Sequence, residues 1–425
     1  MEFKKITVGN FAENLDRFRI PLSSAEREKK RGKYPYYGAA KIIDYVDGFT
    51  HSGLSVLIVE DGSVETDKGY PVVQLANGEY WVNNHTHVLK GKNDWDTLYL
   101  YYALQIIKVS PFVTGAVQKK ISQKALNSME LNYFEDPMIR RKIVESLLGL
   151  DKKIELNTQI NQTLEQIAQT IFKSWFIDFD PVYAKANALA SGQTLEQATQ
   201  AAMTVISGKN TQELHRLQTA NPEQYQQLWE IAEAFPSGVD EEGVPMGWES
   251  KKVGEVAKIV KGKKPKLISS EPDDGFLPHI LMVSLSGKYT EYAQIDKSIV
   301  CDIFDTLILM DGAASGKIAI GHKGVIGSTF AKMELSENKY WALFNQFMFS
   351  KEQDIQANTT GTSIPHTDKA RVLDYEIIVP CDVVLNYFTE MYKNILCSIL
   401  NQRKNSFLLE NVRDLLLPKL LSGEV

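Results

Sequence analysis

The chain contains an internal repeat, and this repeat limits its fold more than any other feature of the sequence. Residues 3–11 match residues 248–256, and Leu164–Ile167 match Leu409–Val412, in both cases at an offset of 245. Thr114-Gly115 matches Thr360-Gly361 at an offset of 246. Because nearly the same offset recurs across most of the chain, the sequence predicts two copies of one structural plan.

Each copy is predicted to consist of a strand-rich part followed by a long helix. Apolar runs end in Asp-Gly turns at Asp61-Gly62 and at Asp311-Gly312, a pattern typical of strands. We therefore expect an α+β protein in which two pseudo-symmetric mixed α/β domains are joined by two long antiparallel helices that form a coiled coil. The expected boundaries are 1–135 and 248–381 for the domains, and 136–180 and 382–425 for the helices.

The two predicted helices carry matching apolar seams, with steps that alternate between three and four residues. Both seams become polar at the same two steps, Asn157 with Asn161 and Gln402 with Ser406. A polar break of this kind stabilises less than leucine does, but it fixes register and partner. The predicted seam comprises Ile143, Leu147, Leu150, Ile154, Asn157, Asn161, Leu164, Ile395, Ile399, Gln402, Ser406 and Leu409. Two unrelated helices, each packed on its own domain, are the alternative, and the matched polar steps favour pairing.

Charge is distributed unevenly along the chain. The net charge is −6, and residues 181–247 account for −5 of it, with three basic and eight acidic residues. This segment has no counterpart in the second copy, and we expect an acidic helical insertion and linker that makes no direct DNA contact. The rest of the chain is nearly neutral, which permits DNA binding at local basic patches without demanding it.

Motifs of known enzyme classes were compared with the sequence and do not match. Residues 312–318 are one residue short of a phosphate loop and have Ile318 where Ser or Thr would meet magnesium. His85 and His87 share one face of an expected strand, but no cysteine or third ligand is near in sequence, which favours a structural role over a metal site. We therefore expect neither a catalytic residue nor a metal site in this chain.

The expected environment is the cytoplasm. No apolar run approaches the ~18 residues of a membrane span. The three cysteines form no disulfide framework, so free thiols are expected.

Basic residues, interspersed with aromatic and amide side chains, cluster in both copies. Lysine and arginine supply phosphate contacts, whereas forked donors and acceptors read base edges. The DNA-binding candidates are Lys29, Lys30, Arg31, Lys33, Tyr36, Tyr37, Gln118, Lys119, Lys120 and Lys124 in the first copy, and Lys263, Lys264, Lys266, His366, Lys369 and Arg371 in the second.

The order of these features resembles the specificity subunit of type I restriction-modification systems over nearly the whole chain. The segments that carry the resemblance are 3–11, 33–39, 114–123, 172–185, 247–262 and 417–423. The resemblance implies two target recognition domains that each read half of a bipartite site in double-stranded DNA, and two helices that set the gap between the halves. It also implies two methyltransferase subunits bound to the helices, and two restriction-translocase subunits. Those partners would bring S-adenosylmethionine, ATP and magnesium, and this chain would bind no cofactor itself.

Two other functions remain open from the residues alone. The chain could be a helical scaffold whose two globular domains bind proteins, or a stand-alone DNA-modifying enzyme with an unrecognised site. The sequence does not indicate which bases are read or how long the spacer is.

Overall fold

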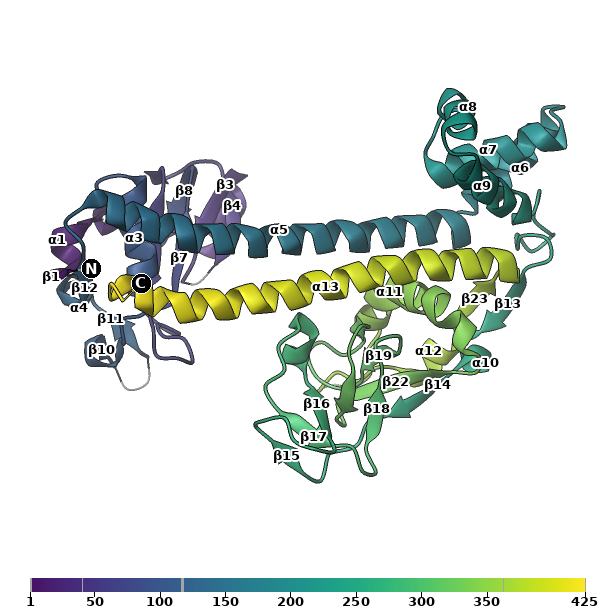
Figure 1. The fold of residues 1–425 in the computed structure, drawn as a ribbon. Coiled ribbons are helices and arrows are strands. Elements are labelled where there is room, and N and C mark those ends of the chain that lie inside the picture. The colour runs from purple at the N-terminus through teal and green to yellow at the C-terminus, as the bar shows by residue number, and fades with distance from the viewer. Residues whose placement is uncertain (1, 40, 116–117, 362, 425) are drawn as a thin grey trace. The chain divides into compact units, whose positions relative to one another are not determined.

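The computed structural model describes residues 2–39, 41–115, 118–361 and 363–424, and Figure 1 shows its ribbon. By its internal contacts the chain divides into two compact units, residues 1–155 with 408–425, and residues 156–407. Each unit contains one β-rich domain and a part of each long helix.

The first β-rich domain is built on two four-stranded sheets, with strand orders β2-β9-β6-β7 and β4-β3-β8-β5. A short pair, β1 with β12, closes the domain. Its strands are β1 (Lys4–Thr7), β2 (Glu13–Asn14), β3 (Arg31–Tyr37), β4 (Ile42–Val46), β5 (His51–Ser52), β6 (Ser55–Val59), β7 (Val73–Ala76), β8 (Glu79–Val82), β9 (Thr86–Lys90), β10 (Val113–Thr114), β11 (Lys120–Ile121) and β12 (Glu130–Tyr133). Its helices are α1 (Val8–Phe11), α2 (Ser24–Lys29), α3 (Asp94–Leu104) and α4 (Gln123–Ser128).

The second β-rich domain has a four-stranded sheet of order β14-β22-β19-β20 and a five-stranded sheet of order β15-β17-β16-β21-β18, with β13 paired to β23. Its strands are β13 (Glu249–Lys252), β14 (Ala257–Lys261), β15 (Ile268–Ser269), β16 (Phe276–Ile280), β17 (Tyr292–Gln294), β18 (Ile299–Cys301), β19 (Thr306–Leu309), β20 (Ile318–Ala319), β21 (Gly324–Ile326), β22 (Phe330–Leu335) and β23 (Glu376–Val379). Its helices are α10 (Val253–Val256), α11 (Trp341–Ala357) and α12 (Lys369–Asp374).

The two domains share one topology. Each has a single parallel pair at an equivalent place, β3 with β8 and β16 with β21, among the strands that the structure describes. In each, the first short helix is fixed by the same backbone bond, which Val8 donates to Met129 and Val253 donates to Tyr375, both at 2.8 Å. The folded domains therefore repeat one plan, as the recurring offset in the sequence predicts.

The long helices α5 (Pro137–Phe176) and α13 (Asp382–Leu421) each contain 40 residues, a length of roughly 60 Å. They pack against each other in antiparallel orientation inside each unit. In the first unit Arg413 pairs with Asp151 at 2.8 Å. In the second, Glu165 pairs with Arg403 at 3.2 Å, and the rings of Phe172 and Phe388 lie 6.2 Å apart.

Residues 180–234 fold into four consecutive helices, α6 (Asp180–Ala190), α7 (Leu195–Ser207), α8 (Thr211–Ala220) and α9 (Pro222–Ala234). Lys185 is buried in this insertion and its ammonium donates to the carbonyl oxygens of Ala232 and Glu233, at the end of α9. Positive charge at a helix C-terminus stabilises the exposed carbonyls there. The one buried lysine side chain described in the insertion thus has a structural role.

Among the described residues, no helix has the length and apolarity needed to span a membrane.

Candidate nucleic-acid interface

Both β-rich domains carry an equivalent hairpin at the end of an equivalent buried strand. Hairpin 1 consists of β10 and β11, and hairpin 2 consists of Thr360-Gly361 with residues 363–367. Asp61, which follows β6, pairs with Lys120 in an antiparallel bridge, and Asp311, which follows β19, pairs in the same way with His366. Two segments that the sequence aligned at an offset of 246 are thus also structural equivalents.

The Thr-Gly step has the same geometry in the two hairpins. Gly115 and Gly361 have φ values of +88° and +91°, a region that favours glycine. A Cβ on Gly115 would lie 2.1 Å from the carbonyl oxygen of Gln118, and one on Gly361 would lie 2.4 Å from that of Ile364. The preceding threonine hydroxyl donates across the hairpin in both, at 3.3 Å. Glycine is therefore required at both turns.

Hairpin 1 is fixed to the domain by a buried cluster of charges around Glu60. The Glu60 carboxylate pairs with Arg19 at 2.6 Å and with Lys120 at 3.0 Å. The Glu60 carbonyl accepts the backbone N–H of Ile121 at 2.8 Å. Burial alone would raise the pKa of Glu60, but hydrogen bonds from Arg19 and Lys120 outweigh it and hold the pKa below its ordinary value. The carboxylate is thus ionised and connects Arg19 and the end of β6 to Lys120 of hairpin 1.

His87 adds a second contact with β11, the strand of hairpin 1 that contains Lys120. Its Nδ1 lies 2.5 Å from Asp16, and its Nε2 donates to the carbonyl of Ile121 at 2.8 Å. Burial raises the pKa of Asp16, yet the bonds from His87 and from the backbone N–H of Val88 lower it further than burial raises it. We refer to Asp16, Arg19, Glu60, His87 and Lys120 as the charged anchor.

The charged anchor also contains the residues best placed to bind a metal. Ligand atoms of Asp16, Glu60 and His87 all lie within 4.8 Å of one another. Arg19 and Lys120 already neutralise the Glu60 carboxylate, and both His87 nitrogens are hydrogen-bonded. This arrangement fits an ion-pair network better than a metal site. His85 lies in the turn before β9 and pairs with Asp61 at 2.8 Å.

Hairpin 2 is fixed mainly by uncharged contacts. Met310 stands where Glu60 stands in the first domain, and it is 2% exposed within the apolar core. Thr367 is the equivalent of Ile121, and its hydroxyl donates to the carbonyl of Leu309 at 2.7 Å. Outside the core, Asp311 pairs with His366 at 2.7 Å and with Lys261 at 2.8 Å. We refer to Met310, Thr367 and their contacts as the apolar anchor.

The predicted DNA contacts near residues 29–37 divide into exposed and buried groups. Lys29, Lys30, Arg31 and Lys33 are exposed at the end of α2 and along β3. Tyr36 and Tyr37 are 1% and 8% exposed, and the Tyr36 hydroxyl accepts the backbone N–H of Leu22 at 2.9 Å. Rings enclosed in this way offer no face to a base, so the expectation that these tyrosines contact DNA is corrected. Adjacent residues of a strand face opposite sides of the sheet, and each ring is covered on its own side, Tyr36 by Arg27 at 5.2 Å and Tyr37 by Tyr80 at 5.7 Å.

The remaining candidates of the first domain lie on and beside hairpin 1. Gln118, Lys119, Lys120 and Lys124 are exposed, and Lys124 is in the first turn of α4. Lys119 pairs with Glu65. Lys120 is half-exposed and part of the charged anchor, so it both fixes the hairpin and reaches its surface.

In the second domain, Lys263, Lys264 and Lys266 are exposed in the loop between β14 and β15. His366 and Lys369 are exposed on hairpin 2 and at the start of α12. Arg371 forms three hydrogen bonds with Asp354, at 2.9, 2.9 and 3.0 Å, which gives its guanidinium a partner within the domain. Within the described residues, no salt bridge engages Lys29, Arg31, Lys124, Lys263, Lys264, Lys266 or Lys369.

The predicted helix seam lies where α5 meets α13. Ile143, Leu147 and Ile399 are buried. Leu150, Ile154, Leu164, Ile395, Gln402 and Leu409 are partly buried. Asn157 is fully buried and donates to the hydroxyl of Ser406 at 3.2 Å, and Asn161 donates to the carbonyl of Ile399 at 3.4 Å. The polar steps of the two helices therefore face each other.

No sequence pattern indicated Asp16, Arg19 or Glu60 as part of this site. Glu60 follows the apolar run of β6 directly, where the second copy has Met310. A charge in one copy at a position that is apolar in the other is the signal that could have found it.

Comparison with known proteins identifies the family to which this architecture belongs. The model of the type I restriction modification DNA specificity domain matches residues 1–166 and 245–382. These ranges cover most of the chain, including both β-rich domains. The chain therefore belongs to the type I restriction-modification DNA specificity family. It is the DNA specificity subunit of such a system.

Individual relatives agree with this assignment. The HindI type I restriction enzyme specificity subunit of Haemophilus influenzae is 33% identical over 338 residues, which cover 72% of this chain and 71% of that protein. The MjaIX specificity subunit of Methanocaldococcus jannaschii is 24% identical over 396 residues, covering 87% and 79%. The crystal structure of a type I S subunit from M. genitalium has the same fold, with a TM-score of 0.56, 15% identity, and coverage of 99% and 96%.

Membership also defines the chemical role of the specificity subunit. Members of this family are non-catalytic and carry no cofactor themselves.

Proposed function

We propose that each β-rich domain reads one half of a bipartite site in double-stranded DNA and that its hairpin carries base-contacting side chains. The proposed domains are residues 1–135 and 248–381, with spacer helices at 136–180 and 382–425 and an acidic insertion and linker at 181–247. The observation that supports this most is that equivalent hairpins expose different side chains, Lys120 in one domain and His366 in the other. Two hairpins that share a backbone conformation but expose different side chains are suited to the recognition of different base sequences.

The other candidate side chains fit two kinds of contact. Exposed lysines without salt bridges, such as Lys29, Lys124, Lys263 and Lys369, are suited to phosphates, which set affinity and register. Gln118 and His366 have the donors and acceptors that base edges require. In this proposal Arg371 positions α12 through Asp354 rather than reading bases.

The subunit would act within a larger assembly. We propose that two methyltransferase subunits bind the paired helices and that restriction-translocase subunits join them, in the cytoplasm. S-adenosylmethionine, ATP and magnesium would belong to those partners. The helices would set the number of unread base pairs between the half-sites.

Mapping of methylated adenines tests the proposal. Co-expression with the cognate methyltransferase should give one split motif with a fixed spacer. Replacement of residues 1–135 by another recognition domain should change one half of that motif and leave the other half and the spacer unchanged.

The matched control is replacement of residues 181–247 by the corresponding segment of a relative, which should leave both half-sites unchanged. Methylation without a split motif, or a change in both halves after the exchange of one domain, contradicts the proposal.

A further inference from the structure

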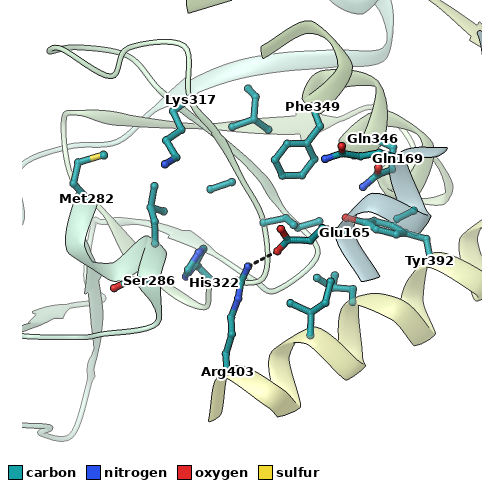
Figure 2. Close-up of a pocket in the computed structure, with 17 residues that line it drawn as sticks. Glu165, Gln169, Met282, Ser286, Lys317, His322, Gln346, Phe349, Tyr392 and Arg403 are labelled. Atoms are coloured by element: carbon teal, nitrogen blue, oxygen red, sulfur yellow. Dashed lines mark hydrogen bonds and ion pairs between the residues drawn. The ribbon is translucent and has the colours of Figure 1, made fainter. Parts of the chain in front are cut away.

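A cavity of about 430 Å³ lies between the second β-rich domain and the paired long helices, entirely within residues 156–407. Helix α5 contributes Glu165 and Gln169, and helix α13 contributes Tyr392 and Arg403. The domain side contributes residues of α11 and of the segment 317–322. Figure 2 shows these side chains around the cavity. Ligand pockets for small molecules commonly have about this volume.

The polar side chains of Gln346 and Tyr392 are enclosed in the wall. Gln346 is 3% exposed, and its Oε1 is a buried atom. The Tyr392 hydroxyl donates to Asn345 Oδ1 at 2.6 Å. The groups left to contact a ligand are therefore the charged side chains and the apolar lining.

The charges in the wall favour an anion. Lys317 points into the cavity in Figure 2, and no salt bridge to a described residue engages its ammonium. Arg403 reaches into the cavity from α13 and pairs with Glu165 at 3.2 Å. Together the side chains of Lys317, Arg403 and Glu165 carry a net charge of +1. Burial, followed by the nearby Arg403 charge, lowers the pKa of His322 to about 4, so its imidazole adds no positive charge near neutral pH.

The remaining lining is largely apolar. Phe349 from α11 lies opposite Leu396 and Ile399 from α13, and Ala168 of α5 is beside them. An aromatic ring is suited to a space with apolar walls and a few convergent polar groups.

We propose that this cavity is a binding site for a small organic anion that has a planar apolar ring. The anionic group would lie between Lys317 and Arg403, and the ring would pack against Phe349 and Leu396. Because both helices and the second domain form the walls, such a ligand would stabilise their contact. A ligand stabilises the packed state of the helices and the second domain to the extent that it binds this state more tightly than a state in which they are separated. This inference does not depend on which bases the hairpins read.

Calorimetric titration of the full chain with naphthalene-1-sulfonate tests the site, because this probe combines a planar ring and an anionic group. Lys317→Met should weaken binding about ten-fold through loss of one charge-assisted contact. The control Lys323→Met removes an exposed lysine, paired with Asp302, next to the same segment, and should leave binding unchanged.

Naphthalene-1-sulfonamide, the neutral isostere of the probe, gives a second test and should bind more weakly than the sulfonate. Lys317→Met should reduce the preference for the sulfonate over the sulfonamide, whereas Lys323→Met should leave it unchanged. Absence of saturable binding at millimolar probe, equal effects of Lys317→Met and Lys323→Met, or equal affinities for the sulfonate and the sulfonamide would overturn the proposal.

Discussion

The two hairpins have the same backbone frame but are fixed to their domains by different chemistry. In the first domain Glu60 joins Arg19 and Lys120 in the charged anchor. In the second, Met310 occupies the equivalent position in the core and the Thr367 hydroxyl supplies one directional bond. The difference shows that a repeated fold preserves the position of its hairpin while the contacts that fix it diverge.

This divergence has a physical cause. Removing one partner of a buried ion pair leaves an uncompensated charge. Substitutions in the charged anchor are therefore tolerated only when its residues change together. A packed methionine depends on shape and tolerates separate changes in its neighbours. Each domain can therefore vary its hairpin surface, but the first domain can do so at Lys120 only if Glu60 keeps another partner.

Exchanging the two anchor residues should have the largest effect. Met310→Glu buries an unpaired carboxylate and should lower the free energy of unfolding by about 3–5 kcal/mol. Glu60→Met removes the ion pairs of Glu60 with Arg19 and Lys120, while Arg19 keeps Asp16 at 3.5 Å, and should cost about 1–3 kcal/mol. Urea unfolding measures both changes.

Hydrogen exchange at the Gly62 and Gly312 amides, which donate to the hairpins, then shows which hairpin is released in each variant. The matched control Glu79→Met, at an exposed position in β8, should change stability by less than about 0.5 kcal/mol. If Glu60→Met and Glu79→Met have equal effects, the charged anchor does not stabilise hairpin 1.

Lowering the pH should destabilise the two anchors to different extents, with a smaller effect than the Glu60 and Met310 substitutions. In the charged anchor, the pKa values of Asp16 and Glu60 are both lowered from their ordinary 3.8 and 4.5. In the second domain, burial raises the pKa of Asp311, but Lys261 and His366 outweigh it and lower the net value. Carboxyls with a lowered pKa add stability above their unfolded pKa, and this is lost as the pH falls through the folded pKa.

Protection of the Gly62 amide should therefore fall more than that of Gly312 between pH 5 and pH 3, roughly across the ordinary carboxyl range. Exchange rates corrected for intrinsic pH dependence provide the measurement. In Glu60→Met the acid-dependent loss at Gly62 should shrink, and an undiminished loss would contradict the role of Glu60.

The repeat and the paired helices could be predicted from the sequence because they depend on local periodicity and on matches at one offset. The polar steps at Asn157 and Ser406 were found from the same periodicity. The charged anchor was not found, because Asp16, Glu60 and His87 meet only when β6 and β9 pair in register. Tyr36 and Tyr37 were predicted to contact DNA because aromatic residues next to lysines resemble a stacking surface, although tertiary packing buries both rings, one on each face of β3.

The most direct test of the account exchanges hairpin side chains without disturbing either anchor. His366→Lys copies the first domain at an exposed position, and its loss of the Asp311 pair should change stability by less than about 0.5 kcal/mol. When methylated adenines are mapped, this variant should alter base preference only in the half-site read by the second domain, and Gln118→Ala only in the other. Changes in both halves from one substitution, or unchanged motifs from both, would contradict independent reading by the two hairpins.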